Sequence, residues 1–231
     1  MAAALRTVPE STASDRDCNQ RIFKEALRIR YGCNDPNNPD TTKCMILGFF
    51  FSTDQVVAAH LVSLKERHIT PLLGFKNVWD NRNGILVHKA LEAHYGSLEL
   101  VYVPNPHTHE IQLRVLYDYL MDTELKPQLK RSVIGVKGKK GKKAMTYRDV
   151  HLRCLLLPNL VFPFRRALLR HARDAYELME GNRKSHDVGT GTAPSEEEWC
   201  VMFEKCSKES DCESCDWYEN MSTASVDSGS D

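Results

Sequence analysis

The chain has 231 residues, 42% of them hydrophobic, which is enough for one domain of ordinary size with a core and tails. Its formal net charge of zero conceals an asymmetry: residues 182–231 hold 12 Asp and Glu against 4 Lys and Arg, which leaves 19 acidic against 27 basic residues in 1–181. No apolar run of 18 residues and no signal-peptide core is present, so we expect an intracellular protein with reduced cysteines and no membrane span.

The N-terminal part of the chain is expected to form a helix and then two strands. Residues 1–19 are rich in Ser, Thr and Asp and predict disorder. Residues 20–31 carry apolar side chains at helical spacing, which predicts a short amphipathic helix. After a turn-rich loop over 32–42, the apolar runs 44–51 and 56–62 predict a strand, a turn and a strand.

The middle of the chain predicts a short helix followed by a hairpin. Residues 81–87 run into a helix over 88–95, which Gly96 ends. Segments 97–103 and 110–120 alternate in polarity on either side of a Pro-Asn-Pro turn, as expected for two paired strands.

The C-terminal part predicts a loop, a helix and a tail. Residues 126–143 form a basic, Gly-punctuated loop, and residues 160–180 predict a helix that starts near Pro163. Beyond Gly181 the chain is acidic and Ser-rich, so we expect disorder with one helical turn near residues 199–203.

Three pieces between residues 56 and 95 could carry chemistry. His60 ends an apolar strand, Asn83 precedes Gly84 in a loop, and His88 and Glu92 are four residues apart on the predicted helix and so share a face. An imidazole can take a proton from water, and a divalent metal can stabilise the charge on a phosphate and its leaving oxygen. These parts together predict one-metal phosphodiester hydrolysis.

The same segments resemble a known family. Cys-Met-Ile-Leu-Gly (44–48), Ala-Ala-His-Leu (58–61), Trp79 and Asn-Gly-Ile-Leu (83–86), with a helix that ends in an aromatic residue and a hairpin after it, are similar to the HNH endonuclease superfamily. The likeness is strongest to the branch abundant in fungal genomes. It covers roughly residues 20–120, about half of the chain.

The resemblance implies an α+β fold with a ββα-metal core, extended by a β-hairpin and flanked by helices. It also implies metal-dependent hydrolysis of DNA, in which His60 is the general base, Asn83 is the central asparagine, and Glu92 with His88 holds Mg²⁺ or Mn²⁺.

The chain departs from the family pattern at three positions. Glu92 stands where the family has its final histidine, Ala59 offers no ligand beside the base, and Gly96 replaces an acidic residue. His88 and His94 are nearby substitutes for the missing histidine, and His88 is the better placed of the two.

The expected organisation follows the resemblance. It comprises a disordered segment (1–19), an HNH-nuclease-like domain (20–125), a basic flexible loop (126–147), a helical extension packed on the domain (148–181) and a disordered acidic tail (182–231).

Each site residue also has a plainer interpretation. His60 could be a core histidine bonded to backbone, Asn83 a turn residue, and Glu92 a surface carboxylate. At the level of the whole protein, the alternative to an endonuclease is a catalytically inactive HNH-fold domain that binds nucleic acid or other proteins.

Outside this region, basic and cysteine clusters suggest further contacts. Five lysines in the basic loop resemble a phosphate-binding or nuclear-localisation segment: Lys137, Lys139, Lys140, Lys142 and Lys143. The arginines at 165, 166, 170 and 173 could form a second basic stripe or the solvated face of a helix. Among Cys200, Cys206, Cys212 and Cys215, only the last two have the spacing of a zinc-ligand pair.

Overall fold

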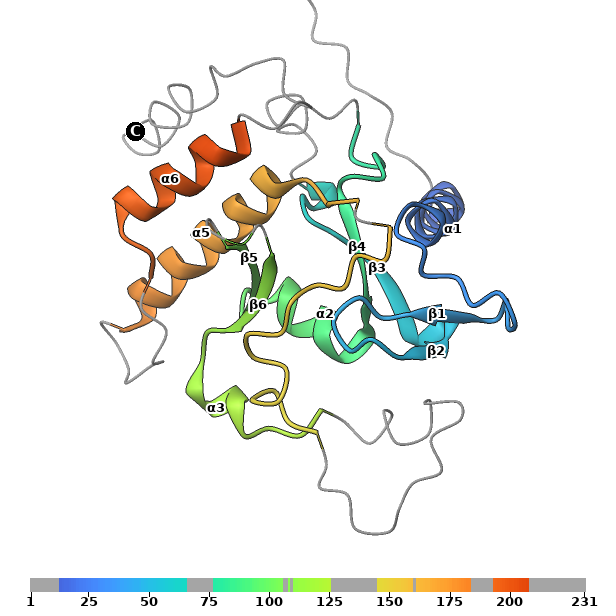
Figure 1. Cartoon of the computed structure of the whole chain (residues 1–231), viewed down its shortest axis with the longest axis horizontal. Helices are drawn as coiled ribbons and strands as arrows, with labels where there is room; N and C mark the ends of the chain where they lie inside the picture. The colour runs from blue at the N-terminus through green and yellow to red at the C-terminus, as the bar shows by residue number, and fades with distance from the viewer. Residues whose placement is uncertain are drawn as a thin grey trace, which may run out of the picture.

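The architecture comes from a computed structural model, which describes residues 13–65, 77–105, 108, 110–125, 145–159, 161–183 and 193–207. It is a mixed α+β fold in which short antiparallel hairpins are covered by helices (Figure 1). The elements in chain order are α1 (Ala13–Arg30), β1 (Thr41–Lys43), β2 (Phe50–Ser52), η1 (Thr53–Gln55), β3 (Val56–His60), β4 (Gly84–His88), α2 (Lys89–Gly96), β5 (Leu100–Pro104), β6 (Ile111–Val115), α3 (Asp118–Met121), α5 (Arg165–Arg183) and α6 (Glu196–Ser207).

The first hairpin differs from the sequence expectation of one strand over 44–51. Strands β1 and β2 pair antiparallel, and residues 44–49 form the connection between them, with Gly48 at a φ of +75°. The connection is apolar because it enters the core: Met45 is fully buried, and its N–H donates to the carbonyl of Leu86 at 2.9 Å. The apolar residues of 44–49 therefore indicate that this segment is buried, and not that it is an extended strand.

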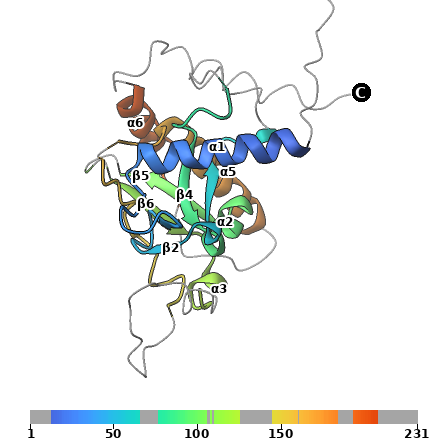
Figure 2. The ribbon, with the colours of Figure 1, turned by 90° about the vertical axis from the view of Figure 1, so that its right-hand side faces the viewer.

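The central unit is the antiparallel pair β3–β4 followed directly by α2. The register sets Val56 opposite His88 and His60 opposite Gly84. Every residue of β4 is buried, because the pair is covered on both faces. Helix α1 lies across one face, as Figure 2 shows.

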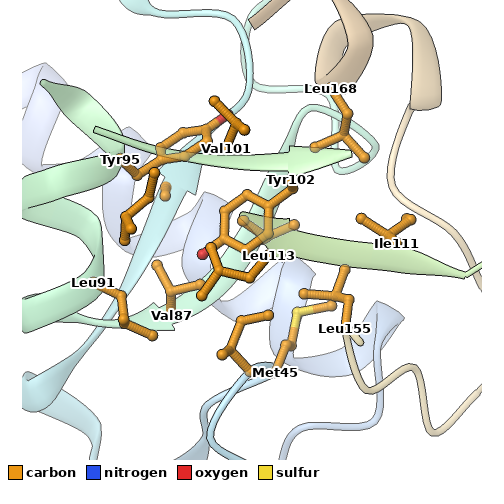
Figure 3. Close-up of a cluster of buried hydrophobic side chains, with 14 of the residues drawn as sticks. Met45, Val87, Leu91, Tyr95, Val101, Tyr102, Ile111, Leu113, Leu155 and Leu168 are labelled. Carbon is orange, nitrogen blue, oxygen red and sulfur yellow. The ribbon is translucent and has the colours of Figure 1, made fainter. Parts of the chain in front are cut away.

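Helix α2 and strand β5 cover the other face of the pair. Val87 points to that side, and Figure 3 shows it in one apolar cluster with Leu91 of α2 and Tyr102 of β5. Residues 56–96 therefore have the order strand, strand, helix.

The predicted second hairpin is confirmed as the antiparallel pair β5–β6. Helix α5, predicted over 160–180, is confirmed from Arg165 and packs against β5. Residues 145–159 and α5 add Tyr147, Val150, Leu155 and Leu168 to the core that the hairpins form. Helix α5 and the segment before it therefore belong to the same core as the hairpins.

Two predictions of disorder are wrong within the described residues. Residues 13–19 belong to α1, which starts at Ala13. In the acidic tail, α6 is a helix of 12 residues where a single turn was expected. Helix α6 packs against α5 through the buried side chains of Trp199 and Met202. The rings of Trp199 and of Tyr176 on α5 have centroids 6.0 Å apart.

Within the described residues, no helix is both long enough and apolar enough to cross a lipid bilayer.

Candidate functional site

His60 lies at the end of β3 on the face that α1 covers. Its ring stacks on Phe23 of α1, with centroids 4.3 Å apart and an interplanar angle of 15°. The ring of Trp79 meets it edge-on at 5.0 Å. The Cβ that an alanine would add at Gly84, opposite His60, would come within 2.5 Å of Phe23, so this side of the pair is tightly filled.

The surroundings of His60 make it a weak base. Its Nε2 is buried and has no hydrogen-bond partner among the described residues. Burial lowers the pKa of His60 to about 4, because a charged imidazole would lose its hydration there. The ring is neutral at pH 7, and its affinity for a proton is far below that of a base tuned to neutral pH.

Asn83 holds together the loop segments that flank the β3–β4 pair. Its side-chain oxygen accepts the N–H of Val62 at 2.9 Å. Its amide nitrogen donates to the carbonyls of Val62 at 3.2 Å and Val78 at 2.8 Å. The side chain is completely buried, and it fixes the backbone two residues beyond His60. Asn83 also ends a turn, since its N–H donates to the carbonyl of Asp80 at 2.8 Å.

His88 does not lie within helix α2, where the sequence predicted it to share a face with Glu92. Helix α2 starts at Lys89, so His88 is its N-cap, and its Nδ1 accepts the N–H of Ala90 at 3.1 Å. The ring is fully buried and lies 4.8 Å from the ring of Phe51. Burial lowers the pKa of His88, with Lys89 as a smaller cause.

Glu92 lies on α2, on the opposite side of the β3–β4 pair from His60. Its negative charge is one of the causes, after burial, that raise the pKa of Tyr102, whose side chain belongs to the cluster on the α2 side. Ala59 points to that same side and has no ligand atom. Over the described part of the chain, no three His, Cys, Asp or Glu side chains gather so that they could hold a metal ion.

No protein-family model, no curated protein and no solved structure matches this chain. What the site can do must therefore be argued from its geometry.

A second polar cluster closes the turn between α2 and β5. Glu99 accepts hydrogen bonds from His94 Nδ1 at 2.6 Å and from Ser97 Oγ at 2.7 Å, and Tyr119 donates to its other oxygen. Burial opposes ionisation, but these hydrogen bonds outweigh it and lower the pKa of Glu99. The sequence suggested His94 only as a substitute for the missing histidine, and the contribution of Glu99 and Tyr119 depends on contacts that no local motif signals.

The proposed basic stripe on α5 does not form as one solvated surface. Arg165 and Arg166 are buried, and the guanidinium of Arg165 lies 4.6 Å from the Phe162 ring centroid. Arg170 pairs with Asp174 at 3.5 Å, and Arg173 with Glu177 at 3.0 Å. Lysines 137–143 and the cysteines at 212 and 215 lie outside the described residues.

Proposed function

We propose that this chain is an HNH-like ββα domain that binds nucleic acid without cutting it, having kept the fold and lost the metal-dependent reaction. The observation that carries the proposal is the position of His60, which packs between Phe23 and Trp79 on the face that α1 covers, whereas Glu92 belongs to α2, which covers the other face. A base and a metal must meet at one phosphate for hydrolysis, and this arrangement separates them.

The positions beside Glu92 support the same proposal. Ala59 and Gly96 stand at places where the resembled family uses polar residues, and His88 is occupied as a helix cap. Glu92 would be left as the single protein ligand, the lower limit for Mg²⁺, which is usually held by one or two carboxylates together with waters and substrate phosphates.

The charge of the body favours nucleic acid, and DNA in particular by the resemblance, as the partner. Residues 1–181 carry 27 basic against 19 acidic residues. Binding would be dominated by contacts with phosphates, and so would weaken steeply with salt.

A plasmid-nicking assay tests the loss of catalysis. We expect the purified chain to leave supercoiled DNA intact with Mg²⁺ or Mn²⁺, and the His60→Ala variant to behave identically. Divalent-dependent nicking by the wild-type protein that His60→Ala abolishes would contradict the proposal.

That contrary result would support the second candidate function, an active HNH-type endonuclease with Mg²⁺ or Mn²⁺ as cofactor. Two observations favour this candidate: the strand–strand–helix order, and the two hydrogen bonds that join the Asn83 side chain to Val62, two residues beyond His60. Glu92→Ala would then weaken divalent-ion binding, which calorimetry can measure.

DNA binding is tested by fluorescence anisotropy over a series of salt concentrations. We propose that the lysines at 137, 139, 140, 142 and 143 contact phosphates, so changing all five to Gln should lower affinity and flatten the salt dependence. Lys65→Gln, at an exposed lysine outside that segment, is the control. Affinity unaffected by the five changes would remove these lysines from the interface.

The same lysines are the basis for proposing nuclear residence. A fluorescent fusion of the five-Gln variant should then lose the nuclear accumulation that the wild-type fusion shows. Equal distribution of the two fusions would contradict it.

A further inference from the structure

Helix α1 has two opposite faces of different character. Phe23 and Leu27 are buried against the β3–β4 pair. On the other side lies an outer stripe of four exposed residues, Cys18, Ile22, Glu25 and Ile29. Ile22 is 60% exposed and Ile29 64%, so two large apolar side chains lie on the solvent side of this helix.

The spacing of the outer stripe is that of a helix-pairing seam. Its members are four, three and four residues apart, the alternation that keeps side chains in line along one edge of a helix and that coiled-coil seams use. At 100° per residue, the stripe points away from Phe23 and Leu27. Figure 2 shows that α1 lies on the outside of the molecule, across the strands that it covers.

The spacing of the outer stripe is unchanged when the stripe is reversed, so two copies can pair about a two-fold axis. An antiparallel pairing about its midpoint sets Cys18 opposite Ile29 and Ile22 opposite Glu25 of a second copy. In this register Glu25 falls one residue from the position opposite Arg21 of the second copy, a gap that a carboxylate and a guanidinium can span. Two symmetric ion pairs would result, because a two-fold interface uses each contact twice.

We propose that the chain self-associates through antiparallel contact of α1 with α1 of a second copy, along the outer stripe. Arg21 is exposed and Glu25 is half-exposed, so these groups are accessible for the contact. Glu25 already accepts from Arg28 at 2.8 Å, which holds the carboxylate at the helix surface and leaves it able to accept a second guanidinium. The Arg21–Glu25 pair forms twice only when the second helix has the same sequence, which favours a second copy over a different partner.

The length of the helix sets the strength of the contact. Eighteen residues make a helix of about 27 Å, so this face alone is smaller than the roughly 800 Å² per partner of a standard interface. The dimer is therefore weak and forms reversibly with concentration.

Sedimentation velocity of the full chain, kept reduced, over a wide range of protein concentration tests the proposal. The mean mass of the wild type should rise towards that of two copies, and Ile22→Asp and Ile29→Asp should abolish the rise. Leu178→Asp, at a leucine of α5 that is 45% exposed, is the matched control and should leave self-association unchanged.

A charge exchange gives an independent test. Arg21→Glu and Glu25→Arg should each weaken the dimer at least several-fold, and the double variant should restore it, because the pair is re-formed with reversed sign. The proposal is overturned if the wild type keeps the mass of one copy at all concentrations. It is also overturned if the Ile22→Asp variant associates like the wild type, or if the double variant is weaker than both single variants. Thermal melts should show that the variants remain folded, as expected for changes at exposed positions.

Discussion

At the scale of single residues, Asn83 has more consequence for the fold than either histidine that was expected to do chemistry. One carboxamide satisfies an N–H and two carbonyls on segments separated by more than fifteen positions in the chain. A buried amide is retained because its removal leaves each of those backbone groups unpaired, away from water.

Asn83→Ala should lower the free energy of unfolding by about 2–4 kcal/mol, since backbone groups of Val62 and Val78 lose their partners. Urea denaturation followed by circular dichroism measures the change. Asn81→Ala is the control: Asn81 is half-buried and accepts only a long bond of 3.4 Å from Arg30, so its loss should be small. Equal losses in the two variants would show that the carboxamide of Asn83 has no special structural role.

At the scale of elements, the contact between α1 and the β3–β4 pair depends on a missing side chain. Gly84 starts β4 at the point where the side chains of Phe23 and Leu27 pack against the strand. Phe23 also stacks there on His60, which pairs with Gly84. The sequence showed Asn-Gly as a turn signal, whereas this glycine serves the close approach of a helix to a strand.

Gly84→Ala should destabilise the protein by about 1–3 kcal/mol, because the added Cβ would lie 2.5 Å from Phe23 and 2.8 Å from Leu27. Gly96→Ala is the matched control, since a Cβ there meets nothing within 4 Å and the position ends a helix. Thermal unfolding of both variants measures the difference, and a Gly84→Ala protein as stable as Gly96→Ala would contradict the packing described here.

Helix α6 gives a second prediction at this scale. Trp199→Ala should detach α6 from α5, because the indole is 4% exposed and meets the ring of Tyr176. Limited proteolysis should then cut within 196–207 faster than in the wild type. Glu197→Ala, at an exposed residue of the same helix, should not change the cleavage rate.

At the scale of the whole molecule, buried neutral histidines couple stability to pH. His171 stacks on Tyr95 with centroids 3.9 Å apart, and burial lowers its pKa to about 4, as it does for His60. The pKa of His88 is lowered for the same reason. Each of these rings joins two elements: His60 meets α1, His88 meets β2, and His171 on α5 meets α2.

The free energy of unfolding should therefore fall as the pH is lowered from 7 to 5. In the unfolded chain these histidines bind protons below about pH 6.5, whereas the folded chain resists protonation until about pH 4, so the unfolded state gains protons first. Each ring would cost up to about 1.4 kcal/mol per pH unit in that window, and less for His60 and His171, which are partly exposed.

Urea titrations at several pH values between 5 and 7 measure this dependence. His171→Leu should reduce the slope, because one titrating group is removed. An unchanged slope in that variant would assign the pH dependence to other groups. The carboxylates whose pKa is lowered, such as Asp80 and Glu99, act only at lower pH, since their stabilisation is lost below about pH 4.5.

The sequence alone determined the local elements wherever the pattern was repetitive. The helix of 20–31, the strand at 56–60, the hairpin after residue 97 and helix α5 follow from periodicity, good helix formers and turn residues. The sequence also suggested that Asn83 is a turn residue, and its N–H closes a turn on the carbonyl of Asp80. It misjudged the apolar run 44–51 and the position of His88, because burial and N-capping depend on neighbours that lie far away in the chain.

Only the tertiary structure decided on which side of the β3–β4 pair each polar residue lies. The side-chain alternation of a strand sends His60 to α1 and Ala59 to α2, but which helix covers which face is set by packing of the whole core. Their closeness in the sequence suggested that His60 and Glu92 belong to one site, whereas in the structure they belong to opposite sides of the strand pair. The physical reason is that successive side chains of a strand point to opposite faces of the sheet, so the backbone lies between them and keeps them apart.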